Sequence, residues 1–239
     1  MANTLNLGDG NWATKKDSLL AYNSENNNYK PLPFDFSRGS SATRINKDDL
    51  IESVGIGEAR IDFQGNTKGA LLLEPSRTNR LNYSEDFSQW TLVGDSIVKT
   101  DEKAFGKNIW RLTETSAGFL GIFKSCQETG LFETTISVLA KPNTSNQLNL
   151  RFGGANNKNL IIDLSDGSVT GKSSGITEHI KNMGNGWYLV SSTITLLNTN
   201  VDVAVYTNSG SIDIIFAQEE AGSYPTSYIP TQGSTVTRL

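Results

Sequence analysis

Short runs of alternating apolar and polar residues recur along most of this chain. The clearest covers residues 132–140, where Phe132, Ile136 and Val138 fall on one face of an extended strand. Further runs of this kind occupy residues 148–152, 160–164, 187–196, 201–206 and 212–216. Turn residues separate the runs, and Thr, Val and Ile dominate them, which predicts a β-sandwich or barrel rather than a helical domain.

The residues before this series differ in pattern. Residues 1–30 are rich in Asn, Ser, Gly and Lys and show little periodicity, so we expect an irregular N-terminal arm. In residues 31–82, the runs 41–45 and 50–54 flank a polar turn, which predicts a β-hairpin within a small β-platform. The remaining residues, 83–239, are expected to form the sandwich.

No stretch of about eighteen residues presents an apolar helical face. The predicted fold class is therefore all-β: an antiparallel β-sandwich preceded by the platform and the arm. The apolar run at 212–216 is nearly continuous, which is typical of a strand covered on both faces.

Charge and composition exclude several partners. The 239 residues carry a formal net charge of -4, whereas a protein that neutralises many phosphates needs clustered Lys and Arg, so nucleic acid is not an expected partner. Residues 1–10 lack the basic flank and apolar stretch of a secretory signal, and no window is long enough to span a bilayer. Cys126 is the single cysteine and cannot form an internal disulfide.

The sequence contains few groups that could act together in catalysis. The one histidine, His179, lies in a strand-like segment, and no Gly-x-Ser-x-Gly elbow occurs. Paired carboxylates are the one enzymatic alternative, because glycoside hydrolysis needs only two. The candidates are Glu52, Glu58, Asp62 and Glu74 in the platform. Pairing with neighbouring arginines explains them without catalysis, so we predict no catalytic residues.

Metal binding is likewise not predicted. Without a second histidine or a cysteine pair, His179 cannot anchor a transition-metal site of the usual kind. Calcium remains an alternative, because Asp95, Asp163 and Asp166 could offer oxygen ligands from loops. Their spacing is not that of a recognised calcium loop.

Aromatic residues carry the argument for ligand binding. A sugar ring stacks its C–H face on a flat aromatic face, while its hydroxyls pair with amide or acidic side chains. The candidate glycan-binding residues are Trp90, Trp110, Trp187 and Tyr188. Packing in the core is the alternative interpretation of each, and adjacent strand residues such as Trp187 and Tyr188 point to opposite faces.

Two segments resemble bacteriophage fibre and spike proteins. They are Phe-Asp-Phe-Ser-Arg-Gly-Ser-Ser-Ala-Thr-Arg-Ile-Asn at 34–46 and Gly-Ala-Leu-Leu-Leu-Glu-Pro-Ser-Arg-Thr-Asn at 69–79. The segments 83–90, 186–188 and 222–231 are also similar to parts of these proteins. The sequence departs from the family at Arg80, where an apolar residue is common, and at Asp49, where a turn glycine is usual.

The resemblance implies a jelly roll of the concanavalin-like or carbohydrate-binding-module type within a virion appendage. The implied function is that of a structural subunit of a head fibre or a tail fibre or spike, made in the host cytoplasm and exposed on the particle. The arm would dock to capsid or tail proteins, with Trp12, Leu19, Leu20 and Tyr22 as candidate contacts. A homodimer or homotrimer is expected, because fibres are usually symmetric oligomers.

Jelly rolls of this kind serve both as glycan readers and as inert spacers, so the function stays open at this point. The alternative to a structural subunit is a glycan-binding adsorption module that recognises host surface polysaccharide. A further alternative is a polysaccharide-degrading enzyme.

Overall fold

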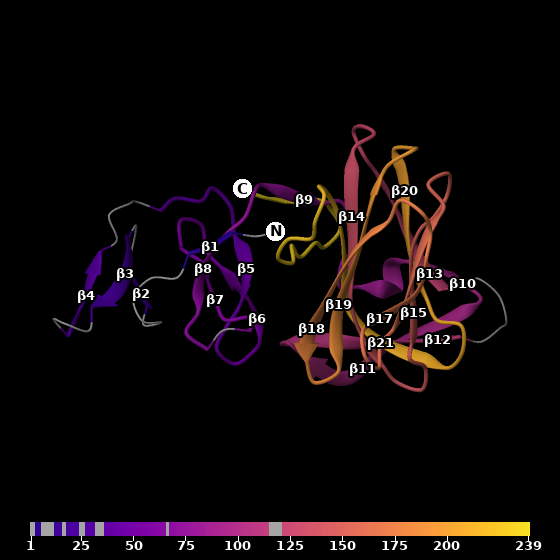
Figure 1. Cartoon of the computed structure of the whole chain (residues 1–239), viewed down its shortest axis with the longest axis horizontal. Coiled ribbons are helices and arrows are strands. Elements are labelled where there is room, and N and C mark those ends of the chain that lie inside the picture. The colour runs from indigo at the N-terminus through magenta and orange to yellow at the C-terminus, as the bar shows by residue number, and fades with distance from the viewer. Residues whose placement is uncertain are drawn as a thin grey trace. The chain divides into compact units, whose positions relative to one another are not determined.

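The computed structural model describes residues 3–5, 12–15, 18–23, 27–31, 36–65, 67–114 and 121–239 (Figure 1). Its contacts divide the chain into two compact units. Unit 1 comprises residues 1–77, 226–229 and 237–239, and unit 2 comprises residues 78–225 and 230–236. The division falls five residues before the boundary expected at 82, and it groups the arm and the platform together.

Unit 2 is an antiparallel β-sandwich of two six-stranded sheets, as the alternating pattern predicts. The first sandwich sheet has the order β10 (Thr91–Val93), β13 (Gly121–Gln127), β20 (Asn200–Tyr206), β15 (Gln147–Phe152), β16 (Lys158–Asp163) and β17 (Ser168–Lys172). The second sandwich sheet has the order β11 (Asp95–Ala104), β12 (Lys107–Glu114), β21 (Ser211–Ala221), β14 (Glu133–Pro142), β19 (Trp187–Thr195) and β18 (Thr177–Gly184). The chain passes repeatedly from one sheet to the other, as in a jelly roll.

The core of unit 2 lies between these two sheets. Alternate residues of β20, such as Val203, and of β14, such as Ile136 and Val138, are fully buried in one hydrophobic cluster. Phe87 of the short 3-10 helix η2 (Phe87–Gln89) joins the same cluster. Strand β21 is central in its sheet and buried along all but its last residue, which confirms the prediction of a strand covered on both faces.

Unit 1 contains short strands. The predicted hairpin is present as β5 (Ala42–Ile45) and β6 (Ile51–Val54). In its turn Asp49 has a φ of 57°, the left-handed conformation that the usual glycine would supply. Two more strands, β7 (Ile61–Asp62) and β8 (Ala70–Leu73), pair with β1 (Asn3–Leu5) in the order β1-β8-β7. Strands β9 (Arg77–Asn79) and β22 (Val236–Arg238) form a two-stranded sheet, and the division between the units passes through both, so this sheet belongs to neither unit alone.

The N-terminal arm is not irregular throughout, in contrast to the expectation from its composition. Strands β2 (Trp12–Lys15), β3 (Ser18–Asn23) and β4 (Asn28–Pro31) form a three-stranded antiparallel sheet. The turn before β4 contains Asn27 at a φ of 47°, and asparagine tolerates this left-handed conformation better than most residues. These strands are short, and the apolar residues of β3 are consecutive rather than alternating, so the period-two pattern did not reveal them. Among the described residues, no helix is both long and apolar enough to cross a membrane.

Candidate functional site

Two of the four candidate glycan-binding aromatics lie in the interior of unit 2. Trp90 and Trp110 are 6% and 7% exposed and belong to the hydrophobic cluster between the sheets. Phe87 packs against both rings, with centroid separations of 5.1 Å to Trp90 and 6.0 Å to Trp110. The indole N–H of Trp90 donates to the Tyr83 carbonyl at 2.8 Å. Neither ring therefore presents a face on which a sugar could stack.

The other two aromatics point to opposite faces of β19, as expected for adjacent strand residues. Tyr188 enters the cluster between the sheets and is 8% exposed. Trp187 faces away from that cluster and is nevertheless 3% exposed. The ring of Phe105 packs edge-on against Trp187, with a centroid separation of 6.2 Å, and Lys141 Nζ lies 6.0 Å from the Trp187 ring centroid. All four candidate aromatics are therefore buried.

The candidate docking residues lie on two strands of the arm. Trp12 is in β2, and Leu19, Leu20 and Tyr22 are in β3. Trp12 pairs with Ala21, and Leu20 pairs with both Ala13 and Pro31. Of these four, Leu20 has a described side chain, which is half-buried. Docking through these residues stays a prediction.

The platform carboxylates stabilise unit 1. Glu74 accepts from Arg60 Nη1 at 2.7 Å and lies 3.1 Å from Arg238 Nη1. Burial alone would raise the pKa of Glu74, but the charges of Arg238 and Arg60 outweigh burial and lower it. Since Arg238 follows the whole sandwich in sequence, this buried network attaches the end of the chain to the platform.

The other three platform carboxylates are also engaged locally. Glu52 binds Arg44 and Asn46, Asp62 accepts from the Ile45 amide, and Glu58 accepts from the Gly55 amide. Their positions are explained by these structural contacts, and no catalytic step follows from them.

Two of the three aspartates considered for calcium act as turn residues, whereas Asp95 is buried at the start of β11. Asp163 accepts from the amide and hydroxyl of Ser165, and Asp166 accepts from the amide of Ser168. Within the described residues, no group of three or more His, Cys, Asp or Glu side chains could hold a metal ion. His179 lies on β18 opposite Ser191.

The outer face of the first sandwich sheet carries a trough over its middle strand. Since Val203 and Val205 point into the core, Ala204 faces outward. In one row across the sheet, Ala204 lies between Phe123 of β13 and Arg151 of β15. Neighbouring strands are about 4.8 Å apart, so the backbones that carry Phe123 and Arg151 are about 10 Å apart, with one methyl group between them.

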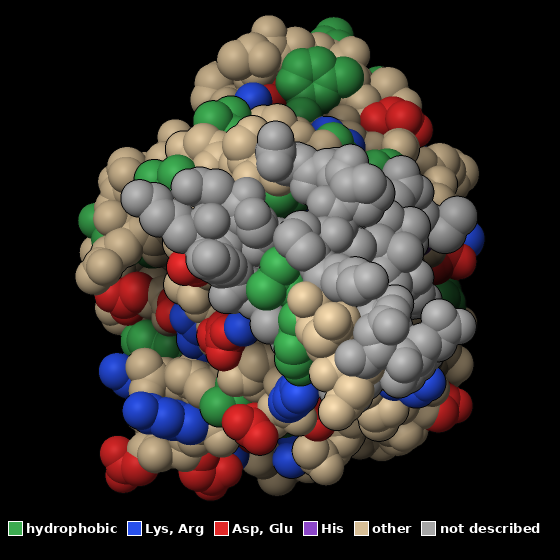
Figure 2. All heavy atoms as spheres, turned by 90° about the vertical axis from the view of Figure 1, so that its left-hand side faces the viewer, with side chains coloured by type: hydrophobic (Ala, Val, Ile, Leu, Met, Phe, Trp, Pro, Cys, Tyr) green, Lys and Arg blue, Asp and Glu red, His purple; other side chains and the backbone are tan. Residues whose placement is uncertain are grey.

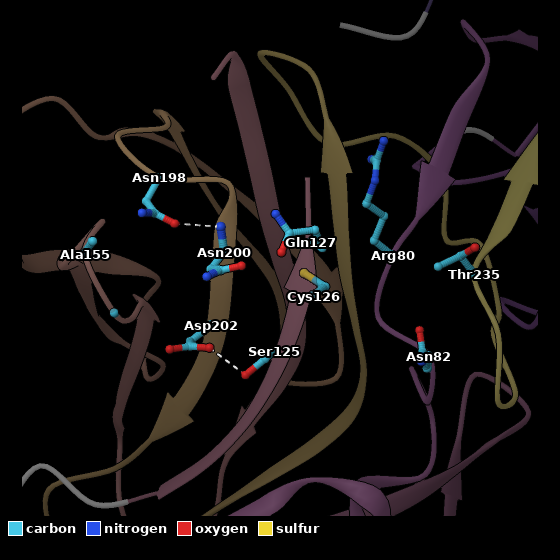
Figure 3. Close-up of a pocket in the computed structure, with 11 residues that line it drawn as sticks. Arg80, Asn82, Ser125, Cys126, Gln127, Ala155, Asn198, Asn200, Asp202 and Thr235 are labelled. Atoms are coloured by element: carbon cyan, nitrogen blue, oxygen red, sulfur yellow. Dashed lines mark hydrogen bonds between the residues drawn. The ribbon is translucent and has the colours of Figure 1, made fainter. Parts of the chain in front are cut away.

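The larger of two pockets on this face has a volume of about 740 Å³. Figure 3 shows Ser125 of β13 beside Asp202 of β20 and Gln127 beside Asn200, with Arg80 and Asn82 across from them. Ser125 Oγ donates to Asp202 Oδ1 at 2.6 Å. The lining thus offers amide, hydroxyl, carboxylate and guanidinium groups together, which is the set of donors and acceptors that suits a polyhydroxylated ligand.

The smaller pocket adjoins the larger one, because Gly154 and Asp202 line both. Its volume is about 190 Å³, and its walls include Phe123, Tyr206 and Arg151. We refer to the two pockets together as the sheet groove. The sheet groove therefore continues from a polar end near Arg80 to an end with aromatic side chains and a second arginine.

A buried ionisable cluster lies beside the larger pocket. Arg80 Nη1 lies 2.8 Å from Glu128 Oε1, and the Glu128 side chain is fully buried. Burial raises the pKa of Glu219 well above its ordinary value, and the neighbouring Glu128 carboxyl raises it further. Burial also raises the pKa of the Cys126 thiol, so this thiol stays protonated and weakly reactive.

Surface charge does not form a block of one sign on the face drawn in Figure 2. Side chains of Lys and Arg lie among those of Asp and Glu over the described part of that face. This mixture agrees with the modest net charge of -4.

Sequence reasoning did not identify the residues of the sheet groove. The departure from the family pattern at Arg80 was one usable signal, since this arginine lines the larger pocket. No sequence signal pointed to Ala204 or Arg151, because these two residues become neighbours only through the pairing of β20 with β15.

Comparison with known proteins gives few matches. No protein-family model matches the sequence, and neither does any curated protein. Among solved structures, the chain is similar to the CBM22-1–GH10 modules of endo-1,4-beta-D-xylanase 10B from Clostridium thermocellum, complexed with xylohexaose. The identity is 13% and the TM-score 0.38, over 64% of this chain and 29% of that one.

A second similar structure is a carbohydrate-binding module of lichenase 5A from Cellvibrio mixtus, in complex with cellotriose. Here the identity is 12% and the TM-score 0.35, over 62% of this chain and 97% of that one. Because both TM-scores are below 0.5, we assign the fold from the two sandwich sheets of this chain and not from these similarities.

Proposed function

We propose that this protein is a non-enzymatic glycan-binding module and that the sheet groove is its binding site. The observation that carries the proposal is the trough over Ala204, flanked by Phe123 and Arg151 and continuous with the polar pocket at Asp202. Pockets of about 300 to 1,000 Å³ are the usual size of small-molecule sites, and the larger pocket falls in this range.

Binding is favoured over hydrolysis by the acidic groups of the sheet groove. Glycoside hydrolysis uses two carboxylates that flank the scissile bond. Of the described residues that line the two pockets, Asp202 alone carries a carboxylate. The nearby pair Glu128 and Glu219 is buried.

The test is to fill the trough. Ala204→Trp places a ring between Phe123 and Arg151 without adding atoms to the core, so we expect the variant to fold and to lose glycan binding. The matched control is Val98→Trp on β11 of the second sandwich sheet, where Val98 is 59% exposed. Both variants and the unmodified chain are applied to an array of bacterial surface polysaccharides and neutral glucans. Binding that survives Ala204→Trp would refute the assignment of the site.

A second candidate function is that of a structural subunit of a phage head fibre or of a tail fibre or spike. What supports it is the resemblance of the segments 34–46 and 69–79 to phage fibre and spike proteins. In this proposal the chain is a homodimer or homotrimer on the virion, the arm docks to capsid or tail proteins, and unit 2 displays the sheet groove to the host.

Deleting residues 1–30 tests the docking role. We expect the shortened chain to fold and to keep glycan binding, but not to incorporate into particles, because the candidate contacts Trp12, Leu19, Leu20 and Tyr22 are lost. The readout is the amount of this chain on purified particles, with the full chain as control. Incorporation at the normal level would contradict docking through the arm.

A further inference from the structure

The guanidinium group of Arg151 is incompletely paired. It carries five N–H donors, and its one side-chain bond among the described residues runs from Nη2 to Asn157 Oδ1 at 2.8 Å. No carboxylate of the described residues lies within ion-pair distance of it. By contrast, Arg80, the other arginine of the sheet groove, is neutralised by the buried Glu128. A cation without a counter-ion therefore lines the smaller pocket.

The walls around Arg151 restrict what can reach it. Phe123 lies two strands away in the same row, and Tyr206, two residues after Ala204 on β20, lines the same pocket. A flat ligand in this space contacts an aromatic side chain on one side and the guanidinium fork on the other. Ala204 between them leaves room for one ring.

A carboxylate fits this arrangement better than the other anions. The guanidinium fork matches the two oxygens of a carboxylate in planar, bidentate geometry. Asp202 lines the same pocket, and its negative charge disfavours a second negative charge on the ligand. A phosphate dianion would bring that second charge to the pocket, whereas a single sugar carboxylate would not. Asp202 can instead accept from ligand hydroxyls.

We propose that the smaller pocket selects a sugar residue that carries a carboxylate, and hence that the ligand is an acidic polysaccharide. This inference rests on the proposed glycan-binding function and names its substrate class. Arg151 binds the carboxylate, Phe123 contacts the ring, and the rest of the chain of sugars extends along the polar pocket toward Asn82.

The experiment compares matched acidic and neutral ligands on the full-length chain. Oligomers of galacturonic acid, hyaluronan oligomers and sialylated oligosaccharides are each titrated as the free acid and as the methyl ester. The variants are Arg151→Gln and, as a control for loss of one positive charge on the same sheet, Lys158→Gln, whose Nζ donates to the Ser174 carbonyl. Circular dichroism and thermal melting establish that each variant is folded.

We expect at least one free acid to bind about tenfold more tightly than its ester, because the charge-assisted bidentate contact is lost on esterification. Arg151→Gln should remove this preference, Lys158→Gln should keep it, and added salt should weaken binding of the acid only. If Arg151→Gln fails to fold, the comparison of acid with ester on the unmodified chain decides whether the protein prefers a ligand that carries a carboxylate.

The possible failures are distinguishable. Equal binding of acids and esters, binding of neutral glycans alone, or an unchanged preference in a folded Arg151→Gln would overturn the inference and leave the glycan-binding function intact. Failure to bind any acidic or neutral glycan would overturn the proposed function and this inference with it.

Discussion

At the scale of single residues, the ionisable groups of the two units are held in opposite states. Glu74 in unit 1 is stabilised as a carboxylate by Arg238 and Arg60. Glu219 in unit 2 is buried beside Glu128, and the charge of Arg80 only partly offsets the resulting rise in the pKa of Glu219. Because burial and the neighbouring Glu128 carboxyl both raise the pKa of Glu219, its carboxyl keeps its proton to a higher pH than an exposed glutamate does.

The raised pKa of Glu219 predicts a specific pH dependence of stability. A carboxyl group whose pKa is higher in the folded than in the unfolded state stabilises the fold fully below the unfolded value of about 4.3, and this contribution is lost as pH rises through the folded value. Glu219→Gln removes the titration, so the stability of the variant relative to the unmodified protein should rise as the pH is raised above about 4.3. Urea unfolding midpoints at several pH values measure this.

The control for this prediction is Glu133→Gln, since Glu133 is exposed at the start of β14. It should leave the pH dependence of the unfolding midpoint unchanged. If Glu219→Gln follows the same pH dependence as the unmodified protein, the buried proton is not held at this pair.

At the scale of strands, the shape of the sheet groove depends on small residues between larger ones. Ala204 of β20 lies between Phe123 and Arg151, and Gly121 of β13 lies closely against Tyr206. A Cβ at Gly121 would lie 2.4 Å from both the Tyr206 Cβ and the Val205 carbonyl oxygen, and one of these is backbone that cannot give way cheaply.

Gly121→Val should therefore destabilise the protein by about 1–3 kcal/mol, which is the usual cost of overpacking. The free energy of urea unfolding measures this loss. Gly171→Val on β17 is the matched control, because the nearest atom to a Cβ there is the flexible Cδ1 of Ile161 at 3.2 Å. If both variants lose the same free energy of unfolding, the close packing of Tyr206 against Gly121 does not explain why a glycine is required at position 121.

The strands show how far the sequence alone can predict this molecule. Period-two alternation around Ile136 and Val138 was sufficient to predict the sandwich, because burial between two sheets imposes that period. The same alternation predicted that Trp187 and Tyr188 point to opposite faces of their strand. It could not show that Phe105, distant in sequence and held at a φ of 53°, covers Trp187.

The candidate site was not predictable for the same physical reason. Aromatic residues were the obvious markers of sugar binding, but in this fold Trp90 and Trp110 fill the core, where large rings bury the most area. The sheet groove is instead defined by the register of β13, β20 and β15, which brings Phe123, Ala204 and Arg151 into one row. Sequence patterns indicate which strands exist, but they do not give this register.

At the scale of the whole molecule, the division into units separates the two proposed roles. Every residue that lines the sheet groove belongs to unit 2, whereas the candidate docking strands β2 and β3 belong to unit 1. Glycan recognition and particle attachment can therefore be changed independently. This separation is what makes the deletion of residues 1–30 informative.

The most direct test of the central claim is a map of where a glycan touches the protein. The isotopically labelled full-length chain is titrated with the glycan that binds most tightly on the array, and backbone amide chemical shifts are recorded. We predict that the largest changes cluster at Phe123, Ser125, Arg151, Asp202 and Ala204, on the outer face of the first sandwich sheet. Changes centred on β11, β12 or β18 of the second sandwich sheet, with the sheet groove unaffected, would contradict the account.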